Sequence, residues 1–126
     1  MTEDAAVSRD TDGLFAAIDA NDAAAFVAYL TDNAVFRFGS APPVSGRAAI
    51  EGAVGGFFDT IDGCSHRVTN VFGNGSTQLC EGDVTYRRHD GSEITLPFAD
   101  VFEYDGELIA QYKIYMDISP LYADPT

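Results

Sequence analysis

The sequence predicts a single α+β domain in which helices pack on one face of an antiparallel sheet. Two observations lead to this fold class. Apolar residues recur at helical spacing in the first half of the chain, whereas the second half alternates apolar and polar residues between turn signals. With 126 residues, the chain can bury one hydrophobic core and is too short for two domains. We therefore expect residues 1–126 to form one domain, with residues 1–9 flexible.

Three helices are predicted in the first half, each from apolar residues that share one helical face. These residues are Leu14, Phe15 and Ile18 in the first helix, Phe26, Tyr29 and Leu30 in the second, and Ile50, Val54, Phe57, Phe58 and Ile61 in the third. Asn21 and Asp22 separate the first two helices, because their side chains favour caps over helix interiors. A short strand is expected at 34–38, and the third helix is expected over 46–61.

Four strands joined by hairpins are predicted in the second half, at 64–72, 76–88, 92–104 and 108–117. The segments between them contain Gly73-Asn74-Gly75, Asp90-Gly91 and Asp105-Gly106, which favour tight turns. Alternation places the even-numbered residues on the inner face of all four strands. Loops of three residues keep that parity across each hairpin.

The same loop lengths predict which residues lie opposite one another. The expected pairs are His66–Gly82, Val68–Cys80, Gly82–Phe98, Cys80–Asp100, Phe98–Ile114 and Asp100–Tyr112. In this register Cys64 faces Val84, about 13 Å along the strand from Cys80, so no disulfide is expected. Arg87 and Glu93, on the outer face, are expected to form a surface ion pair.

Composition and motif content exclude several classes of function. The formal net charge of −13 repels nucleic acids and anionic membranes. No apolar run approaches the length of a membrane span, and the first twelve residues are unlike a secretory signal, so a cytoplasmic protein is expected. The cysteines and histidines match no zinc or redox spacing, and no phosphate-binding glycine loop or serine nucleophile motif is present. We therefore expect no metal and no other cofactor.

Asp100 is the strongest candidate for a functional residue. It shares the predicted inner face with Phe98, Phe102 and Tyr104, and burial among aromatic rings raises the pKa of a carboxyl group. Such a carboxyl can donate a hydrogen bond or exchange a proton near neutral pH. The alternative is a structural carboxyl whose hydrogen bonds are satisfied by Tyr112 or by the backbone.

His66 is the second candidate, on the same inner face. Its backbone lies about 12 Å from that of Asp100 in the predicted register, too far for a direct pair. It either contacts the other end of a small ligand or is a satisfied core histidine. Arg88 either clamps an anionic or carbonyl group or extends to solvent. Tyr86 and Tyr112 are expected in the core, with hydroxyl groups that can reach a ligand.

Several stretches of the chain resemble one superfamily. The phrases AAIDANDAAAFVAYLTDNAVF, GRAAI, LPFADVFEYDGELI and IYMDISPL are similar to the nuclear transport factor 2-like superfamily, and within it to the SnoaL-like group. The resemblance covers nearly the whole chain. It implies a cone-shaped, curved antiparallel sheet with three N-terminal helices on its concave face, around a hydrophobic pocket for a small apolar molecule, commonly in a homodimer. The superfamily includes isomerases, cyclases, hydrolases and binders, so the fold implies no single activity.

Two enzyme families within this resemblance help to interpret single positions. FRFGSAPPVSGR resembles limonene-epoxide hydrolases, which carry a tyrosine and an asparagine at the positions of Phe36 and Phe38, and a catalytic aspartate at that of Ile114. PFADVFEY resembles ketosteroid isomerases, where the position of Asp100 holds the oxyanion-hole aspartate. The general base and the tyrosine of those isomerases have no counterpart here. We therefore expect Phe36, Phe38 and Ile114 to form an apolar pocket wall.

Three functions remain open from the sequence. In the first, Asp100 and His66 catalyse proton transfer on a small apolar carbonyl or polyketide-like compound, as in an isomerase, cyclase or hydrolase. In the second, the same pocket binds an apolar ligand without chemistry. In the third, the chain is a dimeric scaffold with a filled core, and Lys113, Tyr115 and Asp117 on the outer sheet face form the partner surface.

Overall fold

The computed structural model of the protein describes residues 10–123, so the expectation for residues 1–9 lies outside the described residues. The elements are α1 (Thr11–Asp19), α2 (Ala23–Val27), β1 (Leu30–Phe38), β2 (Val44–Ser45), α3 (Arg47–Phe58), β3 (Gly63–Asn74), β4 (Thr77–Arg87), β5 (Glu93–Asp105), β6 (Leu108–Tyr115) and α4 (Ser119–Tyr122). Between residues 10 and 123, no helix is long and apolar enough to cross a membrane.

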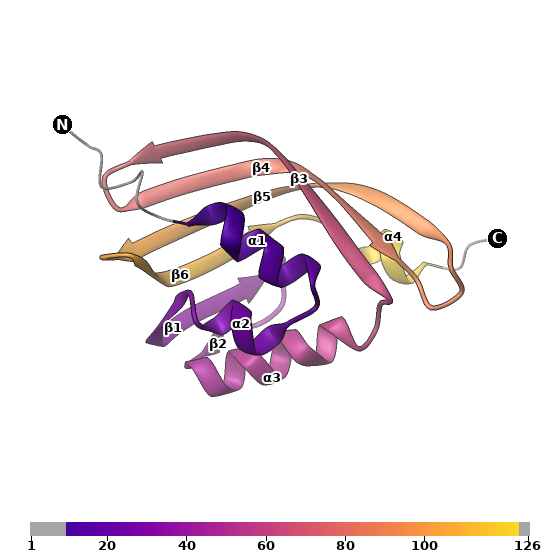
Figure 1. The fold of residues 1–126 in the computed structure, drawn as a ribbon, viewed down its shortest axis with the longest axis horizontal. Helices are drawn as coiled ribbons and strands as arrows, with labels where there is room; N and C mark the ends of the chain where they lie inside the picture. Colours follow the sequence, from indigo (N-terminus) through magenta and orange to yellow (C-terminus); the bar gives the residue numbers. More distant parts are fainter. Residues whose placement is uncertain (1–9, 124–126) are drawn as a thin grey trace.

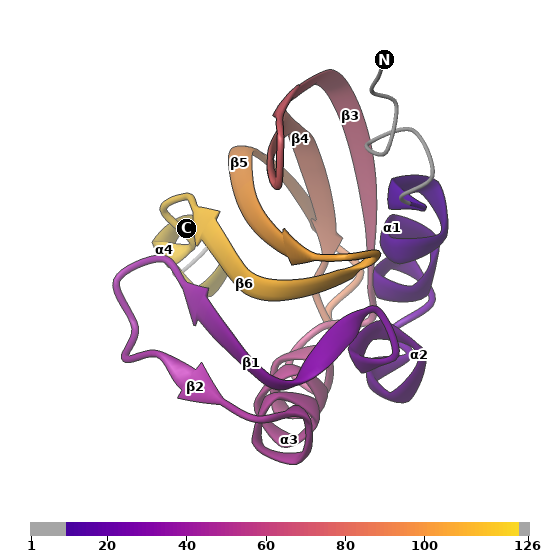
Figure 2. The same cartoon turned by 90° about the vertical axis from the view of Figure 1, so that its left-hand side faces the viewer.

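The six strands form one sheet in the order β2-β1-β6-β5-β4-β3. Neighbouring strands are antiparallel except β1 and β6, which run parallel and place Phe36 opposite Tyr112. The sheet curves around α1, α2 and α3 on its concave side, and α4 follows β6 at the right-hand end of Figure 1 (Figures 1 and 2). Tyr112, Phe26 and Phe102 are among the largest fully buried side chains of the core. The predicted α+β fold with a curved sheet is confirmed.

The second helix is shorter than predicted. Asp22 caps α2 as expected, by accepting a hydrogen bond from the backbone N–H of Ala25 at 3.0 Å. The helix nevertheless ends at Val27, and Leu30, which was expected within it, begins β1. Leu30 lies opposite Ile109 of β6. Strand pairing therefore overrides the helical pattern at this point.

The third helix begins and ends inside its predicted range. Gly46 precedes α3 as its N-cap, with a φ of 91° that favours glycine. The buried face of α3 consists of Ile50, Val54 and Phe58. Arg47, its first residue, donates from Nε to the carbonyl oxygen of Leu30 at 2.9 Å. This bond ties the start of α3 to the start of β1.

Between β4 and β5 the predicted register is confirmed, with Gly82 opposite Phe98 and Cys80 opposite Asp100. Here the backbone N–H of Arg88 donates to the carbonyl oxygen of Ser92 at 2.8 Å, which closes the expected three-residue loop. The inner face of β4 and β5 therefore has the predicted alternation.

Between β3 and β4 the predicted register was wrong, by three residues next to the turn and by two beyond a bulge. His66 lies opposite Val84 instead of Gly82, because the turn has two residues, Gly75 and Ser76, and lies further along the chain than the expected loop at 73–75. A bulge between Val68 and Asn70 then restores the predicted parity toward the base of the hairpin. His66 therefore still faces inward, although its cross-strand neighbour differs.

Between β5 and β6 a two-residue turn and a bulge likewise shift the register while keeping the predicted parity beyond the bulge. Asp100 lies opposite Ile114, where Tyr112 was expected, and the expected pair of Phe98 with Ile114 does not form. The bulge residue is Ala110, so that Ile109 faces inward where the even-numbered Ala110 was expected to, and Ile109 is 1% exposed. Turn length, which sequence alone leaves ambiguous, explains both register errors.

Both cysteines are free, as predicted, although their neighbours differ from the prediction. Cys64 lies opposite Tyr86 instead of Val84, and Cys80 lies opposite Val71 instead of Val68. The shift leaves the two cysteines far apart along the hairpin, so the absence of a disulfide between them does not depend on the register.

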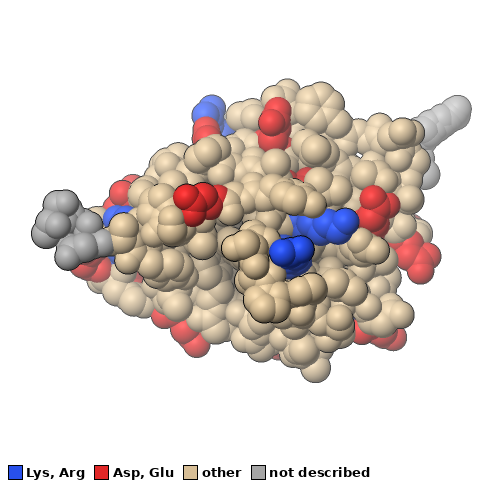
Figure 3. Space-filling model, turned by 180° about the vertical axis from the view of Figure 1, so that it is seen from behind, with Lys and Arg blue, Asp and Glu red and all other residues tan. Residues whose placement is uncertain are grey.

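The charged side chains of the protein are mostly acidic, with 20 Asp and Glu against 7 Lys and Arg. Figure 3, the view from behind, shows Asp and Glu side chains scattered over this face and a few basic side chains near its centre, in keeping with the net charge of −13. The predicted surface ion pair is confirmed, with Arg87 Nε 3.5 Å from a Glu93 carboxylate oxygen. Both side chains are more than half exposed, so the pair contributes little to stability.

Gly82 lies against the bulge of β3. A Cβ atom at this position would overlap the carbonyl oxygen of Arg67 and lie 3.0 Å from the backbone nitrogen of Thr69. These are backbone atoms held by strand pairing, so they cannot move aside as a side chain can. The bulge therefore requires glycine at position 82.

We expect Gly82→Ala to lower the free energy of unfolding by about 1–3 kcal/mol, because the added methyl group displaces backbone. Gly56→Ala is the matched control, since a Cβ there meets no atom within 4 Å. Removing this helical glycine should raise stability by about 0.5–1 kcal/mol. Urea unfolding followed by circular dichroism measures both, and an unchanged midpoint in Gly82→Ala would contradict the steric account.

Candidate functional site

A cavity of about 510 Å³ lies between the concave face of the sheet and the helices. Its size is typical of sites for small organic ligands. Its wall contains both residues predicted to be catalytic, Asp100 and His66. It also contains five of the six residues predicted to contact a ligand, which are Phe36, Phe38, Tyr86, Tyr112 and Ile114. The strands therefore bring these residues together around one mostly apolar space.

Asp100 is a buried carboxyl with one unpartnered oxygen. Asp100 is 3% exposed. Tyr112 donates a hydrogen bond from its hydroxyl group to Asp100 Oδ2 at 3.5 Å. The other oxygen, Oδ1, is buried and has no hydrogen-bond partner among the described residues. Burial raises the pKa of this carboxyl well above its usual range, and the bond from Tyr112 offsets only part of that effect. The protonated form is therefore favoured.

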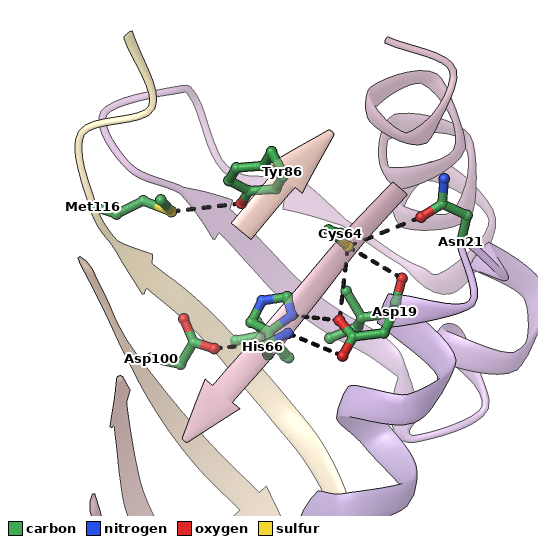
Figure 4. Close-up of polar contacts among 9 residues, drawn as sticks. Asp19, Asn21, Cys64, His66, Tyr86, Asp100 and Met116 are labelled. Atoms are coloured by element: carbon green, nitrogen blue, oxygen red, sulfur yellow. Dashed lines mark hydrogen bonds and ion pairs between the residues drawn. The ribbon is translucent and has the colours of Figure 1, made fainter. Parts of the chain in front are cut away.

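His66 is held at two points by Asp19, the last residue of α1. Asp19 Oδ1 lies 2.6 Å from Nδ1 of the ring, and Oδ2 accepts from the backbone N–H of His66 at 3.0 Å. Because a carboxylate accepts hydrogen bonds, Nδ1 carries a proton and Nε2 is left as the acceptor. In Figure 4 the second ring nitrogen points away from Asp19, toward the side where Tyr86 and Asp100 lie.

Aromatic packing fixes the ring of His66 as well. Its centroid lies 5.1 Å from that of Phe15 and 5.2 Å from that of Phe98. The histidine side chain is only 10% exposed. Hydrogen bonding and packing together leave the imidazole one orientation, which is what an acid–base group needs.

Cys64 lies next to this pair on β3. Its Sγ is 3.7 Å from Asp19 Oδ1 and 3.9 Å from Asn21 Oδ1, and it also approaches the carbonyl oxygen of Ile18 at 3.6 Å. Burial, with the negative charge of Asp19, raises the pKa of the thiol to about 12. As a protonated thiol, Cys64 is a poor nucleophile.

Arg88 lies outside the cavity wall, so its position gives no support to the predicted contact with a ligand. Its guanidinium group donates to the carbonyl oxygens of Leu121 at 2.9 Å and Pro120 at 3.0 Å, and to Ser92 Oγ at 3.1 Å. These bonds hold α4 against the β4–β5 hairpin.

The helix α4 in turn closes part of the cavity, where Ser119 and Tyr122 line the wall. The hydroxyl group of Tyr122 lies 3.0 Å from Thr60 Oγ1, just beyond α3. Arg88 therefore acts on the cavity through α4. It positions one part of the wall and makes no contact with the cavity itself.

Asp19 is the residue of the candidate site that the sequence pattern did not predict. Alternation along the strands relates His66 only to other residues of the sheet, such as Asp100. Asp19 adjoins the apolar face of α1, directly after Ile18, and its partner is 47 positions away. The sequence does place an acidic residue at the end of a helix whose apolar face must cover the sheet. To predict its partner, one must also know which strand that helix covers.

Comparison with known proteins identifies the family of this domain. A family model described as SnoaL-like domain matches residues 11–112. A search of curated proteins gave no match.

Solved structures agree with this family. A proposed polyketide cyclase from Xanthomonas campestris pv. campestris aligns with a TM-score of 0.79 at 20% identity, covering 87% of this chain and 89% of that one. A protein with a ketosteroid isomerase-like fold from Catenulispora acidiphila, in complex with trimethylamine, gives 0.78 at 16%, covering 94% and 89%. An LEH-like epoxide hydrolase from M. tuberculosis gives 0.73 at 16%, covering 88% and 82%. At these identities the likeness shows the fold alone. Since the SnoaL-like model spans most of the chain, the protein belongs to the SnoaL-like family.

Proposed function

We propose that this SnoaL-like protein binds a small, apolar, polyketide-like carbonyl compound and catalyses proton transfer on it, as a cofactor-independent isomerase or cyclase. The observation that carries the proposal is a pair of acid–base groups lining one apolar cavity. One is the Asp100 carboxyl with its unpartnered oxygen. The other is His66, oriented by Asp19.

His66 is the proposed general base. Its Nε2 atom takes a proton from a carbon next to the substrate carbonyl, and the ring becomes an imidazolium ion. Asp19 keeps the reactive nitrogen in its acceptor form and stabilises the positive charge that develops on the ring. Removal of the proton leaves an enolate, whose negative charge gathers on the carbonyl oxygen.

Asp100 is the proposed acid. In its protonated form it donates a hydrogen bond or its proton to the developing enolate oxygen, while Tyr112 holds its second oxygen. In an isomerisation, His66 gives its proton to a different carbon of the enol, while the enol O–H returns its proton to Asp100 as the carbonyl reforms. In a cyclisation, the enol carbon attacks a second carbonyl group, the enol O–H returns its proton to Asp100, and His66 protonates the alkoxide formed at the second carbonyl. Both outcomes return the two groups to their starting protonation states.

The apolar wall supports these reactions over hydrolysis. An epoxide hydrolase needs polar side chains that hold a water molecule for attack. Phe36 and Phe38 supply no hydrogen bond on their side of the cavity, and Phe57 packs against Phe38 at a ring distance of 5.3 Å. An apolar cavity also strengthens the hydrogen bond from Asp100, because competing water is excluded.

We also propose that the protein acts as a homodimer, as the resemblance implies, and in the cytoplasm, as the polar, acidic first twelve residues led us to expect. The exposed ring of Tyr115 on the outer face of β6 supports a partner surface there, since it is 57% exposed. This part of the proposal is independent of the chemistry in the cavity.

The test of proton transfer is hydrogen–deuterium exchange, which needs no knowledge of the final product. A panel of small apolar ketones and diketones is incubated with the protein in D₂O, and exchange at the carbon next to the carbonyl is followed by NMR. We expect His66→Gln to slow exchange by about 10²–10⁴-fold, because the base is lost. Asp100→Leu should slow it by roughly 10²–10³-fold. Asp100→Asn should slow it less, since its amide still donates.

His89→Gln is the matched control, because His89 is a surface histidine that pairs with Asp62 and does not line the cavity. Its exchange rate should equal that of the unmodified protein. Saturable binding of a compound without exchange above the buffer rate would contradict catalysis and support the non-catalytic binder. Exchange that survives in His66→Gln would remove His66 as the base.

A second prediction concerns stability and follows from the raised pKa of Asp100. The pKa of such a carboxyl is higher in the folded state than in the unfolded state, so above the unfolded pKa the group must take up a proton when the protein folds. This proton uptake lowers the free energy of unfolding, and the loss grows as pH rises from the unfolded pKa toward the folded one. Asp100→Asn should therefore raise the free energy of unfolding by about 0.5–2 kcal/mol at pH 7. The gain should shrink toward pH 4. Urea unfolding between pH 4 and 8 measures it, and a gain that is independent of pH would refute the account.

A further inference from the structure

We propose that Asp19, Cys64 and His66 form a binding site for a divalent transition-metal ion, with Zn²⁺ as the preferred ion. Their ligand atoms, which are a carboxylate oxygen, Sγ and a ring nitrogen, all lie within 4.8 Å of one another. The cluster joins the end of α1 to β3 (Figure 4). The sequence reasoning found no metal spacing, because one of the three ligands comes from a helix more than forty residues away.

The spacing of the ligand atoms suits a tetrahedral ion. Zn²⁺ binds oxygen, nitrogen and sulfur at about 2.0–2.3 Å, which places neighbouring ligand atoms roughly 3.5 Å apart. The distance from Cys64 Sγ to Asp19 Oδ1 is already 3.7 Å. The His66 Nδ1 to Asp19 Oδ1 distance is 2.6 Å, a hydrogen bond that would have to open by about 1 Å. The remaining distance, from Cys64 Sγ to the ring nitrogen of His66, is at most 4.8 Å, so side-chain rotations of Asp19, Cys64 and His66 within this range form the site.

Two residues of the cluster are placed to act as a chelate. Cys64 and His66 are separated by one residue on β3, so their side chains lie on the same side of the strand. Both line the cavity, which gives an ion a path from solvent. Thiolate, imidazole and carboxylate together are a donor set that Zn²⁺ prefers over Mg²⁺ or Ca²⁺.

Asn21 is the nearest candidate for a fourth ligand. Its Oδ1 atom lies 3.9 Å from Cys64 Sγ. Asn21 has a φ of 56°, and among the described residues it is the sole residue other than glycine with a positive φ. This conformation follows the end of α1 and directs the side-chain oxygen back toward β3 (Figure 4).

The charges of the site also match a divalent ion. A Cys64 thiolate and the Asp19 carboxylate together balance two positive charges, and the imidazole is a neutral ligand. Because the ion binds the thiolate form of cysteine, binding releases the thiol proton, and affinity should increase with pH.

Metal binding and the proposed proton transfer exclude each other, because both use His66 Nδ1 and the Asp19 carboxylate. A bound ion would replace the hydrogen bond that orients the ring for catalysis. The metal site does not rest on the proposed function, since an ion can bind whether or not the cavity carries out chemistry. The test of the metal site therefore measures metal binding and does not depend on enzymatic turnover.

The experiment is a titration of untagged protein with Co²⁺, a spectroscopic substitute for Zn²⁺, at pH 8. The expected result is a thiolate-to-cobalt charge-transfer absorption at one ion per chain, lost on addition of Zn²⁺, with release of a proton. Cys64→Ser should lose this absorption, and Asp19→Asn should bind at least about 10–100-fold more weakly. Circular dichroism checks that each variant is folded, and Cys64→Ala replaces Cys64→Ser if the latter is not.

Cys80→Ser is the matched control, because Cys80 is buried on β4 and does not belong to the cluster. It should keep the absorption and the affinity of the unmodified protein. No absorption in the unmodified protein at stoichiometric excess of Co²⁺ would overturn the proposal. An absorption that persists in Cys64→Ser and disappears in Cys80→Ser would overturn it as well.

Discussion

The site depends on one carboxylate, that of Asp19. Both of its oxygens are engaged by His66, one by the ring and one by the backbone N–H. The contact connects the end of α1 to β3, which is the edge strand of the sheet and has no strand on its outer side. One interaction therefore closes the helical layer onto the sheet, fixes the imidazole tautomer and brings Cys64 close to two oxygen atoms.

Asp100 differs from Asp19, because one of its side-chain oxygens has no hydrogen-bond partner among the described residues. Tyr112 donates to one of its oxygens, and the other is buried without a hydrogen-bond partner in the part of the chain that the structure describes, in a residue that lines the apolar cavity. Burial of a carboxyl without a full set of donors costs stability, and folded proteins tolerate such groups mainly at functional sites. The two carboxylates thus differ in role because they differ in partners. Asp19 orients a neighbouring group, whereas Asp100 keeps an oxygen without a partner between residues 10 and 123, which the proposed function uses as an acid.

Much of the fold was predictable from the sequence, because periodicity and turn residues are local signals. The β4–β5 register was predicted correctly, and so was the inward direction of Asp100 and His66. The other two registers were not, since a two-residue turn with a bulge keeps the same parity as a three-residue turn. Strand β2 and helix α4 are too short to have a pattern of their own, and contacts such as those of Arg88 determine them. The pairing of Asp19 with His66 depends on helix docking, which no local pattern encodes.

The parallel pairing of β1 with β6 has a consequence for how the chain is made. Phe36 on β1 lies opposite Tyr112 on β6, more than half the chain away. During synthesis β1 can pair early with β2, but nearly all of the domain must emerge before its parallel neighbour β6 exists. Contacts of such long sequence separation slow folding and leave apolar strands exposed to misassembly in the meantime. A nascent chain that stalls before β6 would expose the apolar side of β1, including Phe36, which β6 covers in the folded domain.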